Sequence, residues 1–250
     1  AAILCNPEYW DTYLNRASTF YETNNLYRSL DDLEFLERKT PDSVKVHFGL
    51  GLVKTKLRRF EDALTSFTKA QQLDEKNAEI YINRGTVHYY LKDYKTAYKD
   101  LQKALQLDNR QGNAYNALAL LSISNKEYDS ALSHINRALE MEKNQPYYLN
   151  NRGFIYLQMD SIDKAGKDIN SSIILDPSNG WAYRNKGLLY MTNNNYKGAI
   201  AAYQRALQLD DFIDNMNKLG YSVNWADERK YITFSNKEGE KCRNRKLYPP

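Results

Sequence analysis

The sequence predicts an all-α protein built as a solenoid of helical hairpins, and three observations lead to this fold class. The chain of 250 residues matches itself strongly at an offset of 34 residues. Within each period, apolar residues recur at spacings of three, four and seven, which indicates amphipathic helices. A short break, such as Leu91-Lys92-Asp93 or Asn193-Asn194-Asn195, divides each period into two such helices. Self-similarity at a fixed period of this length is typical of stacked helical repeats.

Five columns of residues define the repeat. They are the small residues Gly51, Gly85, Ala119, Gly153 and Gly187; the large residues Phe60, Tyr94, Tyr128, Ile162 and Tyr196; the alanines Ala63, Ala97, Ala131, Ala165 and Ala199; the apolar residues Phe67, Leu101, Ile135, Ile169 and Tyr203; and the small residues Ala70, Ala104, Ala138, Ser172 and Ala206. Glycine inside a helix costs about 0.8 to 1 kcal/mol relative to alanine. We therefore expect the two helices of a unit to cross at the glycine column with their backbones nearly touching.

These columns resemble the tetratricopeptide repeat (TPR), whose framework places Gly, Tyr, Ala, an aromatic residue and Pro at such intervals. The resemblance covers five clear units from Val44 to Ile213 and a weaker sixth unit that begins at Trp10. It implies a right-handed α-α superhelical solenoid of about six TPR units. The expected units are residues 10–43, 44–77, 78–111, 112–145, 146–179 and 180–213.

The pattern changes after the sixth unit. Met216, Leu219, Val223 and Ala226 predict one more amphipathic helix within residues 214–234, which would cap the apolar end of the solenoid. Residues 235–250 lack periodicity and carry a net charge of +3, so we expect a basic tail there.

Charge and composition argue against several classes of function. The formal net charge of +4 is too small for the positive field of a dedicated duplex-binding protein, so we expect no nucleic-acid partner. No apolar run reaches the roughly 18 residues that a membrane-spanning helix needs. His47, His88 and His134 fall in three different units without metal-ligand spacing, and no catalytic triad is apparent. We therefore expect a noncatalytic protein with no cofactor and no metal.

The compartment and the oligomeric state stay open at this point. Cys5 and Cys242 are too few for a disulfide framework. The segment Ala1-Ala2-Ile3-Leu4-Cys5 resembles a bacterial lipoprotein cleavage site, except that Leu4 is bulky where such sites have a small residue. Both a cytoplasmic protein and one exported after removal of a signal fit these observations.

The family resemblance implies where a partner would bind. In TPR proteins the first helix of each unit lines a concave groove, and the second, fifth, sixth, ninth, twelfth and thirteenth places of the unit commonly face it. The candidate peptide-binding residues at these places are Asn15, Asn83, Asn116, Asn150, Asn151, Asn185, Arg184, Tyr21, Tyr89, Tyr90, Tyr147 and Trp181. The asparagines resemble the ladder with which some repeat proteins hold a peptide backbone, and tyrosine and tryptophan are common interface anchors.

These residues predict a noncatalytic scaffold that binds an extended peptide or a partner helix in its groove. They do not reproduce the two-carboxylate clamp with which some TPR proteins grip a chaperone tail, because the fifth places hold no lysine and the ninth places no asparagine. The alternative is a structural subunit that docks through its convex face or its basic C-terminal tail, including as a membrane-associated lipoprotein.

Overall fold

The computed structural model describes residues 10–23, 25–209, 222–224, 233–235 and 241–243. In this part of the chain the helices are α2 (Trp10–Glu22), α3 (Leu26–Lys39), α4 (Val44–Lys56), α5 (Phe60–Leu73), α6 (Ala78–Tyr90), α7 (Tyr94–Leu107), α8 (Gly112–Ser124), α9 (Tyr128–Met141), α10 (Pro146–Gln158), α11 (Ile162–Leu175), α12 (Gly180–Thr192) and α13 (Tyr196–Gln208). Three short strands follow, β1 (Ser222–Asn224), β2 (Thr233–Ser235) and β3 (Lys241–Arg243). The chain forms two compact units, residues 1–125 and 126–250.

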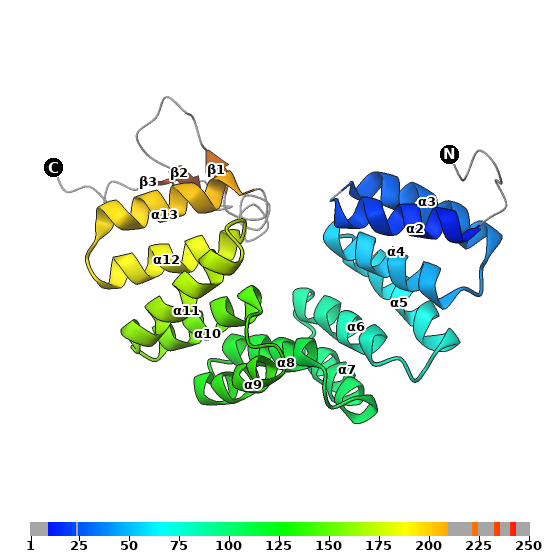
Figure 1. Ribbon diagram of the computed structural model, residues 1–250, viewed down its shortest axis with the longest axis horizontal. Helices are drawn as coiled ribbons and strands as arrows, with labels where there is room; N and C mark the ends of the chain where they lie inside the picture. Colours follow the sequence, from blue (N-terminus) through cyan, green and yellow to red (C-terminus); the bar gives the residue numbers. More distant parts are fainter. Residues whose placement is uncertain (1–9, 24, 210–221, 225–232, 236–240, 244–250) are drawn as a thin grey trace. The chain divides into compact units, whose positions relative to one another are not determined.

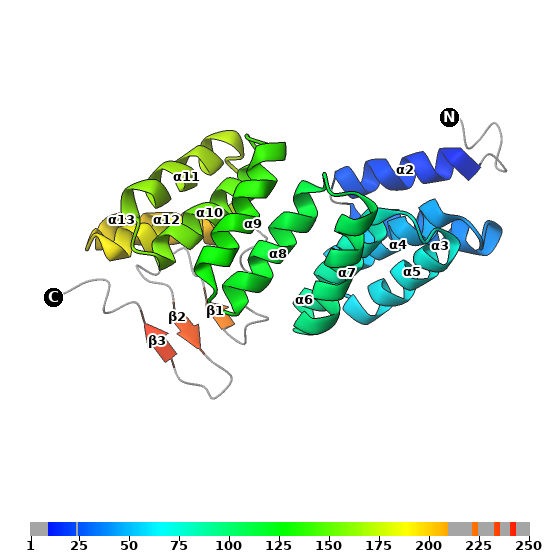
Figure 2. The same ribbon diagram turned by 90° about the horizontal axis from the view of Figure 1, so that it is seen from below.

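Helical hairpins stack in order along each unit (Figure 1). In residues 1–125 the pairs α2–α3, α4–α5 and α6–α7 form hairpins, each second helix packs on the next first helix, and α8 packs on α7. In residues 126–250, α9 packs on α10, and the hairpins α10–α11 and α12–α13 follow. Figure 2 shows the same succession of helices from a second direction. The predicted all-α repeat fold is confirmed, while its handedness stays a prediction.

The turns that follow α4, α6, α8, α10 and α12 each have one residue with left-handed backbone. These residues are Arg58, Lys92, Lys126, Asp160 and Asn194, with φ between 55° and 63°, and they stand 34 residues apart. At Lys92 the following amide, that of Asp93, donates to the carbonyl of His88 at 2.9 Å, which closes a Schellman motif at the end of α6. The Asp93 side chain then accepts from the Thr96 amide and caps α7. The recurring turn thus ends one helix and starts the next.

The glycine column makes room for a side chain of the partner helix. A Cβ on Gly153 would lie 2.7 Å from Ile169 Cγ1, and one on Gly51 or Gly187 would overlap the aromatic ring that follows sixteen residues later. A Cβ on Gly85 would lie 3.2 Å from the Ala97 carbonyl oxygen and equally far from Asp100 Cβ and Leu101 Cγ. The helices of a hairpin approach each other closely at these glycines, but a side chain of the second helix, and not mainly its backbone as expected, occupies the space.

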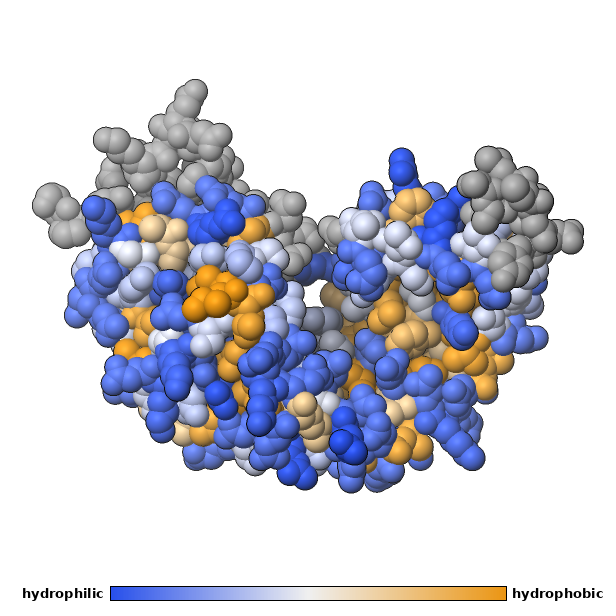
Figure 3. Space-filling model, in the orientation of Figure 1, coloured by the Kyte–Doolittle hydropathy of each residue, from blue (hydrophilic) through white to orange (hydrophobic). Residues whose placement is uncertain are grey.

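Small side chains fill the contacts between successive helices. Every residue of the two alanine columns, including Ser172, is fully buried. His47 is also buried and its Nε2 lies 2.7 Å from the Pro41 carbonyl oxygen, so its role is in packing. Such close packing forms the core of each unit, and hydrophilic residues cover much of the face shown in Figure 3.

The C-terminal prediction requires a correction. Val223 lies in β1, and Thr233 and Phe234 lie in β2, so a helix does not run through the whole of residues 214–234. The predicted tail also contains β3, and the three strands form an antiparallel sheet in the order β1-β2-β3. β-branched and aromatic residues favour extended backbone, and pairing with neighbouring strands satisfies its hydrogen bonds. Residues 210–221 and Cys5 with its predicted cleavage site lie outside the described residues.

Candidate interaction surface on the first helices

All the candidate binding residues lie on the first helices of the hairpins, and the two units share them. Residues 1–125 carry Asn15, Tyr21, Asn83, Tyr89, Tyr90 and Asn116, on α2, α6 and α8. Residues 126–250 carry Tyr147, Asn150, Asn151, Trp181, Arg184 and Asn185, on α10 and α12. Each set lies within its own unit, and contacts between members are seen within a set.

Side-chain amides join α10 to α12 in the second set. Asn185 Nδ2 donates to Asn150 Oδ1 at 2.8 Å, and both side chains are buried, with 3% of each residue exposed. Asn150 Nδ2 in turn lies 3.5 Å from Asn151 Oδ1. Because buried amides need partners, these two asparagines satisfy each other and stabilise the contact between neighbouring first helices. This corrects the expectation that Asn150 and Asn185 present their amides to a peptide.

Arg184 continues this chain of polar groups toward the aromatic residues. Its Nη1 donates to Asn185 Oδ1 at 3.0 Å. The guanidinium carbon lies 5.6 Å from the centre of the Trp181 ring and 6.0 Å from that of Phe154. Burial lowers the pKa of the guanidinium from its ordinary value. The group nevertheless stays protonated, since that ordinary value lies far above neutral pH.

The aromatic residues of the first set contact side chains of their own helix and of neighbouring helices. The Tyr90 ring stacks on Phe60 with centroids 5.4 Å apart, and Tyr89 meets the Tyr90 ring edge-on. The Tyr89 hydroxyl lies 3.4 Å from Ser124 Oγ, and burial raises the pKa of Tyr89. Lys56 Nζ lies 4.1 Å from the centre of the Tyr21 ring, a cation–π contact between α4 and α2. These rings therefore bridge neighbouring helices, while half of Tyr90 stays exposed.

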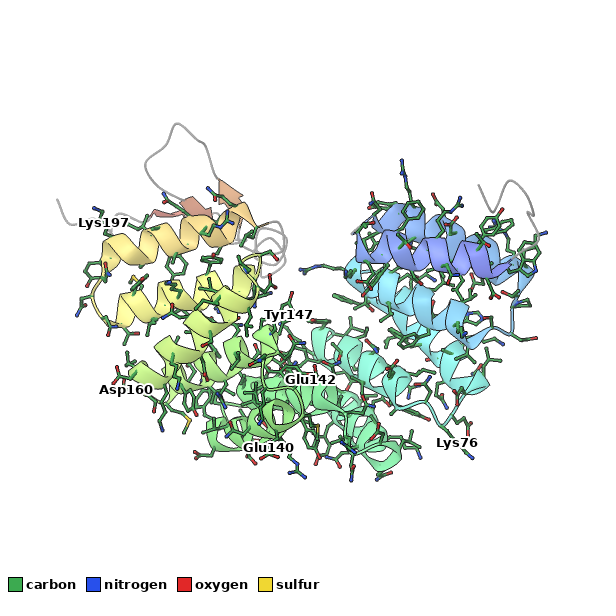
Figure 4. The ribbon with its side chains drawn as sticks, viewed as in Figure 1. Lys76, Glu140, Glu142, Tyr147, Asp160 and Lys197 are labelled. Carbon is green, nitrogen blue, oxygen red and sulfur yellow. The ribbon has the colours of Figure 1, made fainter. Side chains whose placement is uncertain are left out.

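The asparagines of the first set differ in their surroundings. Asn83 Nδ2 donates to the Glu79 carbonyl of its own helix at 2.8 Å. Asn15 is exposed on α2, and Asn116 is half-buried on α8. Tyr147, in the second set, is 48% exposed and projects from the beginning of α10, at the opposite end of that helix from Asp160 (Figure 4). Tyr90 and Tyr147 are thus the most exposed aromatic candidates.

A set of ion pairs that the sequence reasoning missed stabilises every second hairpin. Arg16 pairs with Asp32, Arg84 with Asp100 and Arg152 with Asp168, each through a two-pronged contact between the first and second helix. The carboxylates are nearly buried, with 8% of each side chain exposed. The signal was present in the sequence, since these pairs repeat at 68 residues, twice the repeat length. Arg152 is accordingly a structural residue and not a scattered surface cation.

Clusters of metal-ligating residues and hollows are the remaining candidate sites to consider among the described residues. No group of three or more His, Cys, Asp or Glu residues among them could hold a metal ion. An open hollow of about 550 Å³ lies at the start of α9, lined by Lys126, Glu127, Tyr128, Asp129, Ser130, Gln158 and Met159. None of the described helices is long and apolar enough to cross a membrane.

Models of the tetratricopeptide repeat match residues 14–78, 78–110, 112–145 and 180–211. These ranges cover more than half of the sequence. The chain belongs to the tetratricopeptide repeat family. Members of this family are generally noncatalytic scaffolds that bind protein partners. No curated protein matches this TPR chain in sequence.

Solved structures show the same fold at low sequence identity. A chain in the crystal structure of the APC/C hetero-tetramer Cut9–Hcn1 superposes with a TM-score of 0.76 at 18% identity, over 84% of the present chain and 42% of that chain. The present chain therefore spans less than half of that protein. A tetratricopeptide repeat protein from Parabacteroides merdae superposes with a TM-score of 0.71 at 17% identity, over 88% of both chains. PilF of Pseudomonas aeruginosa superposes with a TM-score of 0.62 at 19% identity, over 84% of this chain and 97% of its own.

Proposed function

We propose that this TPR protein is a noncatalytic interaction scaffold whose first helices bind an extended peptide or a partner helix. The observation that carries the proposal is the exposure of aromatic rings on these helices, with 51% of Tyr90 and 48% of Tyr147 open to solvent. A tyrosine offers a large rigid surface and one polar tip at low entropic cost, which suits it to an interface. The general role of the family in protein binding supports the same conclusion.

Peptides selected on the full chain test this proposal. Random dodecapeptides displayed on phage supply ligands, and isothermal titration calorimetry measures their affinities. We expect Tyr90→Ala or Tyr147→Ala, according to which unit binds the peptide, to weaken binding by about 5- to 30-fold, since an interface anchor contributes roughly 1 to 2 kcal/mol. Tyr98→Ala is the matched control, because Tyr98 is 52% exposed on the second helix α7.

The results separate the outcomes. A selection that yields no peptide contradicts the proposal, and so does a peptide whose affinity depends only on Tyr98. A loss of peptide affinity in Tyr90→Ala or Tyr147→Ala, together with unchanged affinity in Tyr98→Ala, supports binding on the first helices. The asparagines are tested by Asn83→Ala/Asn151→Ala, which retains full affinity if the amides do not contact the peptide.

A specific observation also favours a second candidate, a structural subunit that docks through the second helices. Ile174 is 78% exposed and its neighbour Leu175 45% exposed at the end of α11. Exposed aliphatic side chains side by side are common at protein interfaces. If this candidate is right, Ile174→Asp prevents assembly in size-exclusion chromatography while peptide binding is kept. Removal of residues 235–250 tests docking through the basic C-terminal segment in the same assay.

A further inference from the structure

The guanidinium of Arg184 has no acidic partner among the described residues. No carboxylate in this part of the chain lies within 4.0 Å of it, and its one hydrogen bond goes to the neutral amide of Asn185. A guanidinium has five N–H donors, so most of its donating capacity is not used in this contact. The site therefore holds a partly desolvated positive charge that no described group neutralises.

Arg152, a neighbouring arginine of the same unit at a different place of the repeat, is compensated by a carboxylate of its own hairpin. Arg152, on the adjacent first helix α10, donates through Nε to Asp168 Oδ2 at 2.6 Å and through Nη2 to Asp168 Oδ1 at 3.0 Å. The position that corresponds to Asp168 in the next hairpin is Ala202. Lys186 takes the place of Arg152 there, while Arg184 stands at the place of Asn150, so the hairpin α12–α13 lacks both this ion pair and its carboxylate.

We infer that Arg184 binds one Asp or Glu side chain of a peptide that lies on α10 and α12. The carboxylate would accept two parallel hydrogen bonds from the guanidinium, which is the geometry that arginine favours. The rings of Trp181 and Phe154, whose centres lie 5.6 and 6.0 Å from the guanidinium carbon, would exclude water from this contact and so strengthen it. The inference rests on the proposed function and gives the chemistry of one contact within it.

The charge of the site selects a carboxylate over a phosphate group. The other arginine of these two first helices, Arg152, is already neutralised by Asp168, and Lys186 lies against the Tyr190 ring at 5.9 Å. Recognition of a phosphorylated peptide or a nucleic-acid backbone uses several cations together. One guanidinium with two aromatic rings within 6.0 Å matches a single negative charge with apolar neighbours.

The test compares peptide pools selected on matched variants of the full chain. Random dodecapeptides on phage are selected separately on the wild type, on Arg184→Gln and on Arg137→Gln. Arg137 is an exposed arginine of α9 that pairs with Glu140, so its replacement removes one positive charge from the same unit at another place. The best wild-type peptide is then synthesised with its acidic residue as Asp, Asn or phosphoserine, and its affinity is measured by isothermal titration calorimetry.

We expect the wild-type and Arg137→Gln pools to share an Asp or Glu at a fixed distance from an apolar residue, and the Arg184→Gln pool to lack it. The Asp peptide should bind the wild type about 10- to 100-fold more tightly than the Asn peptide, and equally on Arg184→Gln. A converged pool without an acidic position, or a discrimination that survives in Arg184→Gln, overturns the inference alone. Tighter binding of the phosphoserine peptide overturns the choice of a carboxylate, and the absence of any selected peptide contradicts the proposed function itself.

Discussion

The buried ion pair between Arg152 and Asp168 leads to a prediction that the chain's own repeats make quantitative. In the hairpin α4–α5 the same two places hold Leu50 and Ser66, and Leu50 is fully buried there. The family fold thus accepts either an ion pair or an apolar and a small residue at this contact. Asp168→Ser changes one partner alone, whereas Arg152→Leu/Asp168→Ser converts the contact into the form found in α4–α5.

The exposure of the two groups sets the magnitude. Removing one partner of a fully buried pair costs about 3 to 5 kcal/mol, and an exposed pair contributes about 0 to 1 kcal/mol. Here 24% of the Arg152 side chain and 8% of the Asp168 side chain are exposed, and Asn136 also accepts from Arg152. We expect Asp168→Ser to lower the local free energy of opening by about 2 to 3 kcal/mol, between those limits. The free energy of opening of the double variant should lie within about 1 kcal/mol of that of the wild type, because a buried leucine contributes hydrophobic stabilisation.

Native-state hydrogen exchange is the appropriate assay, because helical repeats open locally and a single unfolding midpoint averages over all of them. Exchange of the α10 and α11 amides reports the opening of this hairpin. The amides of α6 and α7, which carry the intact pair of Arg84 with Asp100, serve as the internal reference. The single variant Arg152→Leu completes the comparison. If the double variant loses as much free energy of opening as Arg152→Leu and Asp168→Ser added together, the pair is not coupled and the reasoning is wrong.

Three further predictions concern stability. Gly153→Ala should lower the free energy of unfolding by about 1 to 3 kcal/mol, because its Cβ would meet Ile169. Gly166→Ala should raise the free energy of unfolding by up to about 1 kcal/mol, because the nearest atom to its Cβ, in Leu189, lies at 3.4 Å. Urea unfolding of the two variants compares these values. Lys92→Gly should raise the midpoint of thermal unfolding, because glycine adopts the left-handed backbone at this position (φ 63°) without the strain of about 1 kcal/mol that a side chain adds. An unchanged midpoint contradicts this prediction. Burial raises the pKa of Tyr148 in the folded protein. The free energy of unfolding therefore stays at its full value below the pKa of about 10 that tyrosine has in the unfolded chain, and it falls as the pH rises above that value. Tyr148→Phe should flatten this decline when the free energy of unfolding is measured between about pH 9 and 11.

Local regularity made much of the fold predictable from the residues. The first helices begin at Trp10, Val44, Ala78, Gly112, Pro146 and Gly180, the residues at which the predicted units begin. The glycine column and the residue that fills it stand sixteen positions apart within one hairpin, so their contact follows from the period alone. The C-terminal prediction failed at Val223 because strands of three residues are too short to produce a period of their own.

Contacts between hairpins decided which candidate residues a ligand can reach. Asn150 and Asn185 occupy places that the family pattern assigns to the groove, yet they bond to each other across α10 and α12. Whether an amide pairs with a neighbour or faces solvent depends on the distance between two packed helices, which spacing along the chain does not contain. The same holds for the surroundings of Arg184: Trp181 lies three residues away on the same helix, but the contact with Phe154 of α10 arises only when successive hairpins pack together.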